Sequence, residues 1–162
     1  MIVAGIDPGK TGALAIIYPD GNVHFFDVPL IDIKGKSVPA WSEWNKTWCS
    51  ALDFAGVDLV TIEEVTAGQN GIKQGVQSMF NFGRALGFAH GIAMGITPRP
   101  VVRTVPPSVW KPKYGLTHAG KGASREKCRT LYPKSEPFLT RVKDDGRAEA
   151  ALIADYGKRN FA

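Results

Sequence analysis

Residues 1–18, MIVAGIDPGKTGALAIIY, contain two apolar runs on either side of the polar segment PGKTG. Short runs rich in β-branched residues are typical of buried strands. Residues 1–7 and 12–18 are therefore predicted to form two antiparallel strands joined by a tight turn. The PDGN segment that follows is favoured in hairpin turns, which predicts a third strand over residues 23–28. The chain thus opens with a three-stranded antiparallel meander.

The same patterns predict the remaining elements. Strands are expected at residues 57–62 and 100–105, helices at residues 39–55, 77–94, 124–131 and 144–159, and loops at residues 30–38 and 66–75. The fourth strand is apolar almost throughout, so both of its faces should be buried. Trp41, Trp44 and Trp48 recur at helical spacing, which is typical of a helix face packed on a core. The predicted fold class is α/β, a mixed five-stranded sheet that begins with the meander and has helices on both faces.

The second predicted helix has a face of small residues. Gly83, Gly87 and Gly91 follow one another at intervals of four, so they lie on one side of the helix. Such a face permits close packing against the sheet or another helix, or an interface with a second copy of the chain. Phe80 and Phe82 in the same helix are predicted to belong to the core.

The composition is that of a globular protein. Of 162 residues, 44% are hydrophobic and 22% are charged, and this length predicts one domain over residues 1–162. No apolar stretch approaches the length of a membrane span, and Met1 leads into a strand rather than a leader peptide. A cytoplasmic protein without membrane association is expected. Cys49 and Cys128 lack the spacing of a metal or disulfide framework, which predicts free thiols.

The basic residues are concentrated in one segment of a chain whose net charge is +5. Residues 98–143 contain eleven Lys and Arg residues against two Glu residues, whereas the rest of the chain is net acidic. A cationic surface beside an acidic centre is typical of proteins that bind nucleic-acid phosphates.

Acidic residues stand at the ends of three predicted elements. Asp7 ends the first strand, Glu63 follows the fourth, and Asp145 and Glu149 lie four apart on one face of the last helix. Carboxylates that converge on one point are the ligands that a hard divalent cation needs. The neighbouring Glu64 is an alternative to Glu63, because adjacent residues of a strand face opposite sides of the sheet.

Two of these acidic segments have other readings. The segment GIDPGKTG is no phosphate-binding P-loop, because Ala4 replaces the first required glycine and a strand rather than a helix follows. Asp144 and Asp145 also suit a helix N-terminus, where Asp144 is a plausible N-cap. That reading explains Glu149 poorly, since Glu149 lies among alanines and larger apolar residues.

Three segments, GIDPGKTGALAI, TIEEV and DDGRAEAALIA, resemble the acidic motifs of RuvC-type Holliday junction resolvases, which belong to the ribonuclease H-like and retroviral-integrase superfamily. The resemblance extends over nearly the whole chain. The segments SVWKPKYGLT and MFNFGRALG look most like those of phage-encoded members. The resemblance implies a ribonuclease H-like fold and a crossover junction endodeoxyribonuclease that cuts four-way DNA junctions by paired nicks.

The resemblance also implies the active-site residues. Asp7, Glu63, Asp145 and Glu149 are the implied catalytic residues and the ligands of two Mg²⁺ ions, for which Mn²⁺ is expected to substitute. Asp144 is the alternative ligand to Asp145. Many bacterial members have His or Asp three residues before the final acid, where this chain has glycine.

Basic residues and partners follow from the same resemblance. Lys111 and Lys121 would hold the phosphates of the junction, and Lys113 and Arg125 of the same basic segment are predicted to contact DNA. Because a four-way junction has two-fold symmetry, a homodimer with two sites is implied. Branched DNA is the expected partner, and no nucleotide cofactor is expected.

Three alternatives remain at this point. A broader branched-DNA nuclease is the first, because bacterial members insert an aromatic residue into the junction where this chain has Thr66. A non-catalytic nucleic-acid-binding relative of the fold is the second. An actin-like or sugar-kinase fold, which also starts with a GIDxG strand, is the third, but it requires roughly twice this length.

Overall fold

A computed structural model describes residues 1–64 and 75–162. Its main sheet has five strands in the order β3-β2-β1-β6-β7, namely β1 (Val3–Asp7), β2 (Ala13–Ile17), β3 (Val23–Asp27), β6 (Leu59–Glu63) and β7 (Val101–Val105). The first three strands pair antiparallel, whereas β6 pairs parallel to β1 and β7 pairs parallel to β6. The predicted mixed sheet and its opening meander are therefore confirmed.

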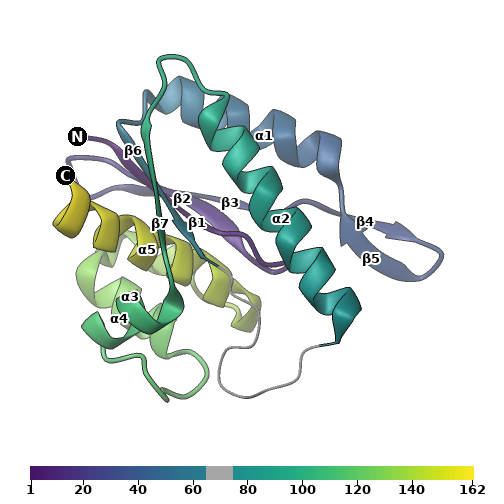
Figure 1. Ribbon diagram of the computed structural model, residues 1–162. Coiled ribbons are helices and arrows are strands. Elements are labelled where there is room, and N and C mark those ends of the chain that lie inside the picture. Colours follow the sequence, from purple (N-terminus) through teal and green to yellow (C-terminus); the bar gives the residue numbers. More distant parts are fainter. Residues whose placement is uncertain (65–74) are drawn as a thin grey trace.

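Helices cover both faces of this sheet (Figure 1). They are α1 (Trp41–Ala55), α2 (Val76–Met94), α3 (Pro107–Lys113), α4 (Ala123–Leu131) and α5 (Asp145–Phe161), with two short 3₁₀ turns, η2 (Pro133–Phe138) and η3 (Val142–Asp144). Strands β1, β2 and β6 divide their side chains between the two faces. Val3, Ala13 and Leu59 pack toward α5, while Ala4, Leu14 and Val60 pack toward α1 and α2. Every residue of β6 is buried, as predicted for a central strand.

The tryptophan face of α1 belongs to the core, as its spacing predicts. Trp44 and Trp48 are fully buried, and Trp41 packs against the same cluster. Among the described helices, none is long and apolar enough to cross a bilayer. Cys49 and Cys128 are free thiols.

Helix α5 lies unusually close to the sheet because glycines line the contact. A Cβ atom added at Gly5 of β1 would lie 2.1 Å from the Ala150 carbonyl oxygen. A Cβ atom added at Gly146 would lie 2.1 Å from the Thr11 carbonyl oxygen, in the turn between β1 and β2. Real Cβ atoms do not approach backbone this closely, so these glycines set the distance at which the acidic start of α5 crosses the ends of the strands.

The expected loop at residues 30–38 is wrong. Residues there form a hairpin of β4 (Leu30–Ile33) and β5 (Lys36–Pro39) outside the main sheet. Lys34 and Gly35 form its turn with positive φ of 52° and 74°, and the Gly35 N–H donates to Asp32 Oδ1 at 3.0 Å. All residues of β4 are exposed, so the alternation of buried and exposed side chains that identifies a strand is missing.

The predicted packing of α2 is also partly wrong. Gly83, Gly87 and Gly91 are exposed, and a Cβ atom added at any of them would meet nothing within 4 Å. Their face is therefore open rather than packed against another described element of the chain. Phe80 is 60% exposed and not a core residue, while Phe82 is half-buried. The buried residues of α2 are instead Ala85, Ala89 and Ile92, which lie on the side of the helix opposite the glycines.

One further segment differs from the prediction, and another lies almost entirely outside the described residues. Residues 107–113 form the helix α3, which the two prolines and the basic residues there concealed. Pro107 occupies the first turn of this helix, where proline is tolerated because its missing N–H has no partner to lose. The predicted loop at residues 66–75, with Thr66, lies outside the described residues except for Gly75, which precedes α2.

The close approach of α5 can be tested at Gly146. Because an added Cβ atom would collide with backbone, Gly146→Ala is expected to lower the free energy of unfolding by about 3 kcal/mol. The matched control is Ser50→Ala on the exposed side of α1, where alanine should stabilise the helix by about 0.5 kcal/mol. Urea denaturation followed by circular dichroism measures both, and equal effects of the two substitutions would contradict the packing described for α5.

Candidate active site

Three of the predicted acids lie near one another where the carboxyl ends of the central strands β1 and β6 approach α5. Asp7 ends β1 and Glu63 ends β6, and these parallel strands are in register, with Ile6 opposite Ile62. Their carboxyl ends therefore lie next to each other. Glu149 projects from the second turn of α5, the helix that packs on β1. The three carboxylates repel one another, and this repulsion contributes to raised pKa values at Asp7 and Glu63.

The local environment opposes ionisation of two of these acids. Removal from solvent is the largest cause and raises the pKa of the Asp7 carboxyl to about 6, against the lowering effect of the Gly9 N–H, which donates to Asp7 Oδ1 at 2.9 Å. Removal from solvent likewise raises the pKa of Glu63 to about 8, and the negative charge of Asp7 adds to it. Acids held in this state are typical of sites that need a cation to complete them.

Lys111 of α3 is the cation nearest to these acids in the part of the chain that the structure describes. Its Nζ lies 3.3 Å from both Oε1 and Oε2 of Glu149 and favours the charged forms of Asp7 and Glu63. Two neutral donors complete the arrangement. Trp110 Nε1 donates to Glu63 Oε1 at 3.0 Å, and Ser124 Oγ donates to Glu149 Oε1 at 3.1 Å. The orientation of Glu63 and Glu149 is therefore set by α3 and α4.

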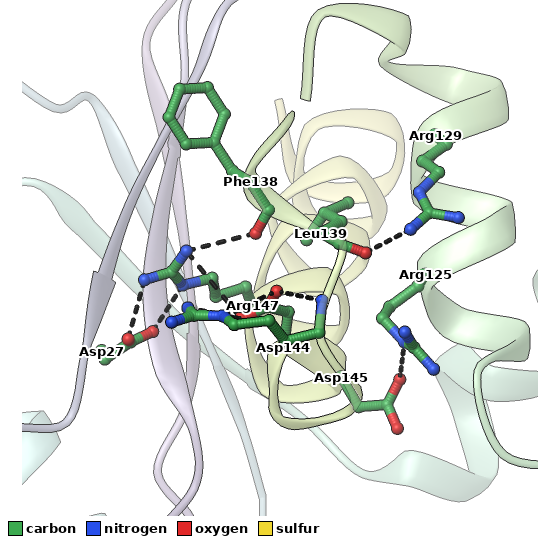
Figure 2. Close-up of polar contacts among 9 residues, drawn as sticks. Asp27, Arg125, Arg129, Phe138, Leu139, Asp144, Asp145 and Arg147 are labelled. Carbon is green, nitrogen blue, oxygen red and sulfur yellow. Dashed lines mark hydrogen bonds and ion pairs between the residues drawn. The ribbon is translucent and has the colours of Figure 1, made fainter. Parts of the chain in front are cut away.

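Asp145 does not join the three converging acids. Its Oδ1 accepts a hydrogen bond from Arg125 Nε at 2.7 Å, an ion pair between α5 and α4 (Figure 2). Asp145 and Glu149 nevertheless line the same cavity, of about 260 Å³, together with Lys111 and Lys121. The expectation that Asp145 and Glu149 face one space is therefore met, with Arg125 as the present partner of Asp145.

Asp144 is committed to a structural role. Arg141 Nη2 donates to Asp144 Oδ1 at 2.7 Å, the Arg141 backbone N–H donates to Oδ2 at 2.7 Å, and the Asp144 side chain is only 2% exposed. Burial opposes its ionisation, but these hydrogen bonds and the charge of Arg147 hold the pKa of Asp144 below its usual value. A carboxylate used in this way cannot also face the cavity. Its position precedes α5, but its side chain makes no capping hydrogen bond to that helix.

Gly146 explains why the position three residues before Glu149 holds no ligand. The Thr11 carbonyl occupies the space that any side chain there would need. The acid on this turn of α5 can therefore stand only one residue earlier, at Asp145, which shares a helix face with Glu149.

Arg147 ties the start of α5 to the opposite edge of the meander (Figure 2). It donates from Nε to Asp27 Oδ1 at 2.6 Å and from Nη2 to Asp27 Oδ2 at 2.7 Å, and its Nη1 donates to the Phe138 carbonyl at 3.1 Å. Bidentate pairs of this kind fix geometry as well as charge. The acids on either side of Arg147 are thereby held in place.

A buried carboxylate anchors the other end of the site. Asp155 on α5 accepts hydrogen bonds from Tyr114 Oη at 2.7 Å, from Tyr132 Oη at 2.6 Å and from Arg159 Nε at 2.6 Å. Burial raises and these donors lower the pKa of Asp155, with a net decrease. Tyr114 follows α3 and Tyr132 follows α4, so Asp155 holds Lys111 and Ser124 against α5. Asp155 is not among the residues predicted from the sequence, although an Asp among Ala, Leu and Ile in an apolar helical pattern indicates a buried, hydrogen-bonded carboxylate.

The predicted DNA-contacting residues differ in their availability. Lys113 and Lys121 are exposed. Lys111 and Arg125 are engaged with Glu149 and Asp145 respectively. The first two can therefore bind phosphate directly, whereas the other two would have to exchange a carboxylate for a phosphate.

The donor set suits a divalent cation. Within residues 1–64 and 75–162, no three acidic, His or Cys side chains lie close enough to form a finished metal cage. The converging groups are carboxylates only, Asp7 and Glu63 are desolvated, and the Lys111 ammonium offsets part of their charge. Hard divalent cations prefer oxygen ligands of this kind. The chemistry of these residues therefore fits a divalent metal ion.

The order of the strands, the parallel pairing of β1 with β6 and the packing of α5 on β1 define a RuvC-type, ribonuclease H-like fold. The structure of Thermus thermophilus RuvC is similar with a TM-score of 0.60 at 20% identity, covering 98% of this chain and 96% of RuvC. The complex of that RuvC with a Holliday junction substrate gives 0.62 at 19% identity with the same coverage. The complex of the fowlpox virus resolvase with Holliday junction DNA gives 0.53 at 16% identity, covering 99% of both chains.

Sequence comparison finds a more local similarity. The chain is 38% identical over 80 residues to the chloroplastic Holliday junction resolvase MOC1 of Chlamydomonas reinhardtii. The matched region is 49% of this chain and spans 8% of the length of that relative. No protein-family model matches the sequence. The predicted fold and the resemblance to RuvC-type resolvases are confirmed.

The state of Glu63 can be tested by replacing it with its neutral isostere. A carboxyl whose pKa is raised by folding destabilises the folded state increasingly as pH rises from its ordinary value toward the raised one. Without metal, Glu63→Gln is therefore expected to raise the free energy of unfolding by on the order of 2 kcal/mol at pH 8 and by much less at pH 5. Thermal unfolding at both pH values measures the difference.

The same experiment tests metal binding. Mg²⁺ at millimolar concentration should raise the melting temperature of the wild type, because a ligand that binds only the folded state stabilises it, and should do so far less in Glu63→Gln. The adjacent Glu64→Gln serves as the matched control and should respond to Mg²⁺ like the wild type. Equal responses of all three proteins to Mg²⁺ would remove Glu63 from the metal site.

Proposed function

We propose that this chain is a metal-dependent endonuclease that resolves four-way DNA junctions by paired nicks. The observation that carries the proposal is the convergence of Asp7, Glu63 and Glu149 on a RuvC-type fold, beside a cavity lined by lysines. The similarity to the Holliday junction resolvase MOC1, and the fold shared with RuvC and the fowlpox resolvase in their complexes with junction DNA, support the same substrate class. In this proposal the 162 residues form one nuclease domain that acts in the cytoplasm of a bacterial or phage-infected cell.

Asp7, Glu63, Asp145 and Glu149 would hold the two Mg²⁺ ions. When bound, the ions would polarise the scissile phosphate and lower the pKa of the attacking water. Trp110 keeps one oxygen of Glu63 engaged and leaves the other oxygen available for a cation. Ser124 limits the rotation of Glu149 in the same way. These two donors make the site partly preorganised before substrate binds.

Lys111 has a second role in this proposal. Its ammonium neutralises Glu149 in the free protein. Once cations satisfy the carboxylates, the flexible side chain of Lys111 is free to bind a phosphate oxygen of the substrate. Lys113 and Lys121, which are both exposed, would add phosphate contacts whose strength falls with salt.

The nuclease proposal has two competitors that one assay separates. Labelled four-way, three-way, flap and linear DNA are incubated with the protein, with and without Mg²⁺. Symmetric nicks confined to the four-way substrate support the proposal. Equal cutting of flaps and three-way junctions would indicate a broader branched-DNA nuclease, and binding without any cutting would indicate a non-catalytic relative.

Asp7→Asn identifies the catalytic carboxylate. Because Asp7 ends the strand that pairs with β6 and packs on α5, and so lies near both other acids, its loss should reduce cleavage by more than about 10²-fold while leaving junction binding within about twofold. Gel-based cleavage and fluorescence anisotropy measure the two quantities. The matched control Asp53→Asn, on the exposed side of α1, should change neither. Normal cleavage by Asp7→Asn would refute the assignment.

A homodimer is the second part of the proposal. The face of α2 that carries Gly83, Gly87 and Gly91 has no described partner within the chain, and the exposed Met79 and Phe80 lie on the same helix. Small residues on an open apolar face permit the close approach of a second helix. Two copies joined there would present two active sites to the two strands that a symmetric resolution must cut.

Gly87→Arg tests the interface. A long charged side chain at the centre of the face should shift the protein to monomers, because its charge would be buried without a partner. Size-exclusion chromatography with light scattering measures the mass at micromolar concentration. Lys46→Arg on α1 is the control and should leave the mass unchanged. A wild-type protein that is monomeric under the same conditions would refute the dimer.

A further inference from the structure

A second cavity lies beyond the turn that follows Asp7. Its volume is about 340 Å³, and it is formed where this turn, the β4–β5 hairpin and the first turns of α1 and α2 come together. Pro8 and Lys10 contribute the wall nearest to the active site, and Trp41 and Phe82 contribute aromatic surface. Cavities that hold small ligands begin at about this size.

Arg84 is the distinctive residue of this cavity. Its guanidinium carbon lies 4.8 Å from the centre of the Trp41 ring and 5.7 Å from that of Phe80. Trp41 in turn stacks on the fully buried Trp44, with ring centres 5.4 Å apart and an interplanar angle of 20°. The planar cation therefore rests on a rigid aromatic support, which reduces the entropy lost when it binds a ligand.

The charge of the cavity is unbalanced. Arg84 forms no ion pair with any acidic residue in the described part of the chain. Lys10 is the second cation, and no acidic residue of residues 1–64 or 75–162 lines the walls. Ser78 and Asn81 add polar groups that can hydrogen-bond to the edge of a planar ligand. An anionic ligand with a flat, polar-edged ring fits these features.

The location limits what this ligand can be. Pro8 and Lys10, which line the cavity, are one and three residues from Asp7, so the cavity is close to the position that a phosphate bound at Asp7 would occupy. A duplex cannot enter a space of this size, but a single unstacked base can. Bases at the branch point of a junction are the easiest to unstack, because their stacking is already interrupted. Stacking of a base on aromatic or guanidinium planes is tolerant of base identity, whereas polar groups at its edge are not.

We propose that this cavity binds one unstacked nucleotide of the junction, close to the cleaved phosphate, with Lys10 and Arg84 at its phosphates and Phe82 against its base. The inference rests on the proposed junction-binding function. It assigns to the cavity the choice of base at one position near the cut.

The experiment couples single changes in the protein to single changes in the DNA. Asp7→Asn protein is used so that binding is measured without cleavage. Phe82→Ala in that background is expected to weaken binding to an intact junction by about tenfold. For junctions with one abasic site placed in turn at each position near the branch point, this difference should vanish at one position and persist at all others. Phe54→Ala, a 93% exposed phenylalanine at the end of α1, is the matched control and should change no affinity.

Arg84→Gln supplies an independent measurement. Loss of one phosphate contact should reduce the slope of log affinity against log salt by about one. Thermal unfolding shows whether each variant folds, and Asn81→Ala replaces Phe82→Ala if the latter does not. Unchanged affinity in the variants, or a difference that persists at every abasic position, would overturn the cavity proposal. Wild-type protein that neither binds nor cuts four-way junctions would instead overturn the proposed function.

Discussion

The contact between α5 and the sheet is the constraint on which the site depends. Gly5 and Gly146 remove the side chains that would otherwise separate the helix from β1 and from the turn after Asp7. Only at this distance can Glu149 on the helix reach the ends of the two parallel strands that carry Asp7 and Glu63. The same contact excludes a ligand at residue 146 and leaves Asp145 as the acid on that turn of the helix.

The carboxylates of the site repel one another, and the surrounding structure holds them together despite this repulsion. Asp7 and Glu63 are desolvated beside Glu149, which is unfavourable for their ionised forms. Lys111 offsets part of this repulsion, and the buried Asp155, through Tyr114 and Tyr132, keeps the helices that supply Lys111 and Ser124 in place. Stabilising contacts thus surround a cluster of acids whose mutual repulsion is unfavourable, which is typical of sites that bind cations.

Similarity to known proteins is distributed unevenly along the chain. The fold extends over 98% of the chain in the comparison with Thermus thermophilus RuvC at 20% identity, whereas 38% identity to the Chlamydomonas resolvase is confined to 80 residues. A sheet covered by helices tolerates extensive sequence change if the apolar pattern of the core is kept. Apart from the turn after Asp7, the cavity beside Arg84 is built by α1, α2 and the β4–β5 hairpin rather than by the acid-bearing strands and α5. In those elements the chain can differ from its relatives without disturbing the acids.

The amino-acid sequence by itself determined the meander, the central apolar strand, the tryptophan face of α1 and the positions of the acids at the ends of elements, because local periodicity and turn residues specify these features. It did not reveal the exposed β4–β5 hairpin, whose strands have no buried face, or the open face of α2, since a glycine stripe suits either packing or exposure. Only the tertiary structure decided that Lys111 pairs with Glu149, 38 residues away, and Arg147 with Asp27, 120 residues away. Pairings at such separations depend on how whole elements pack, which no local pattern encodes.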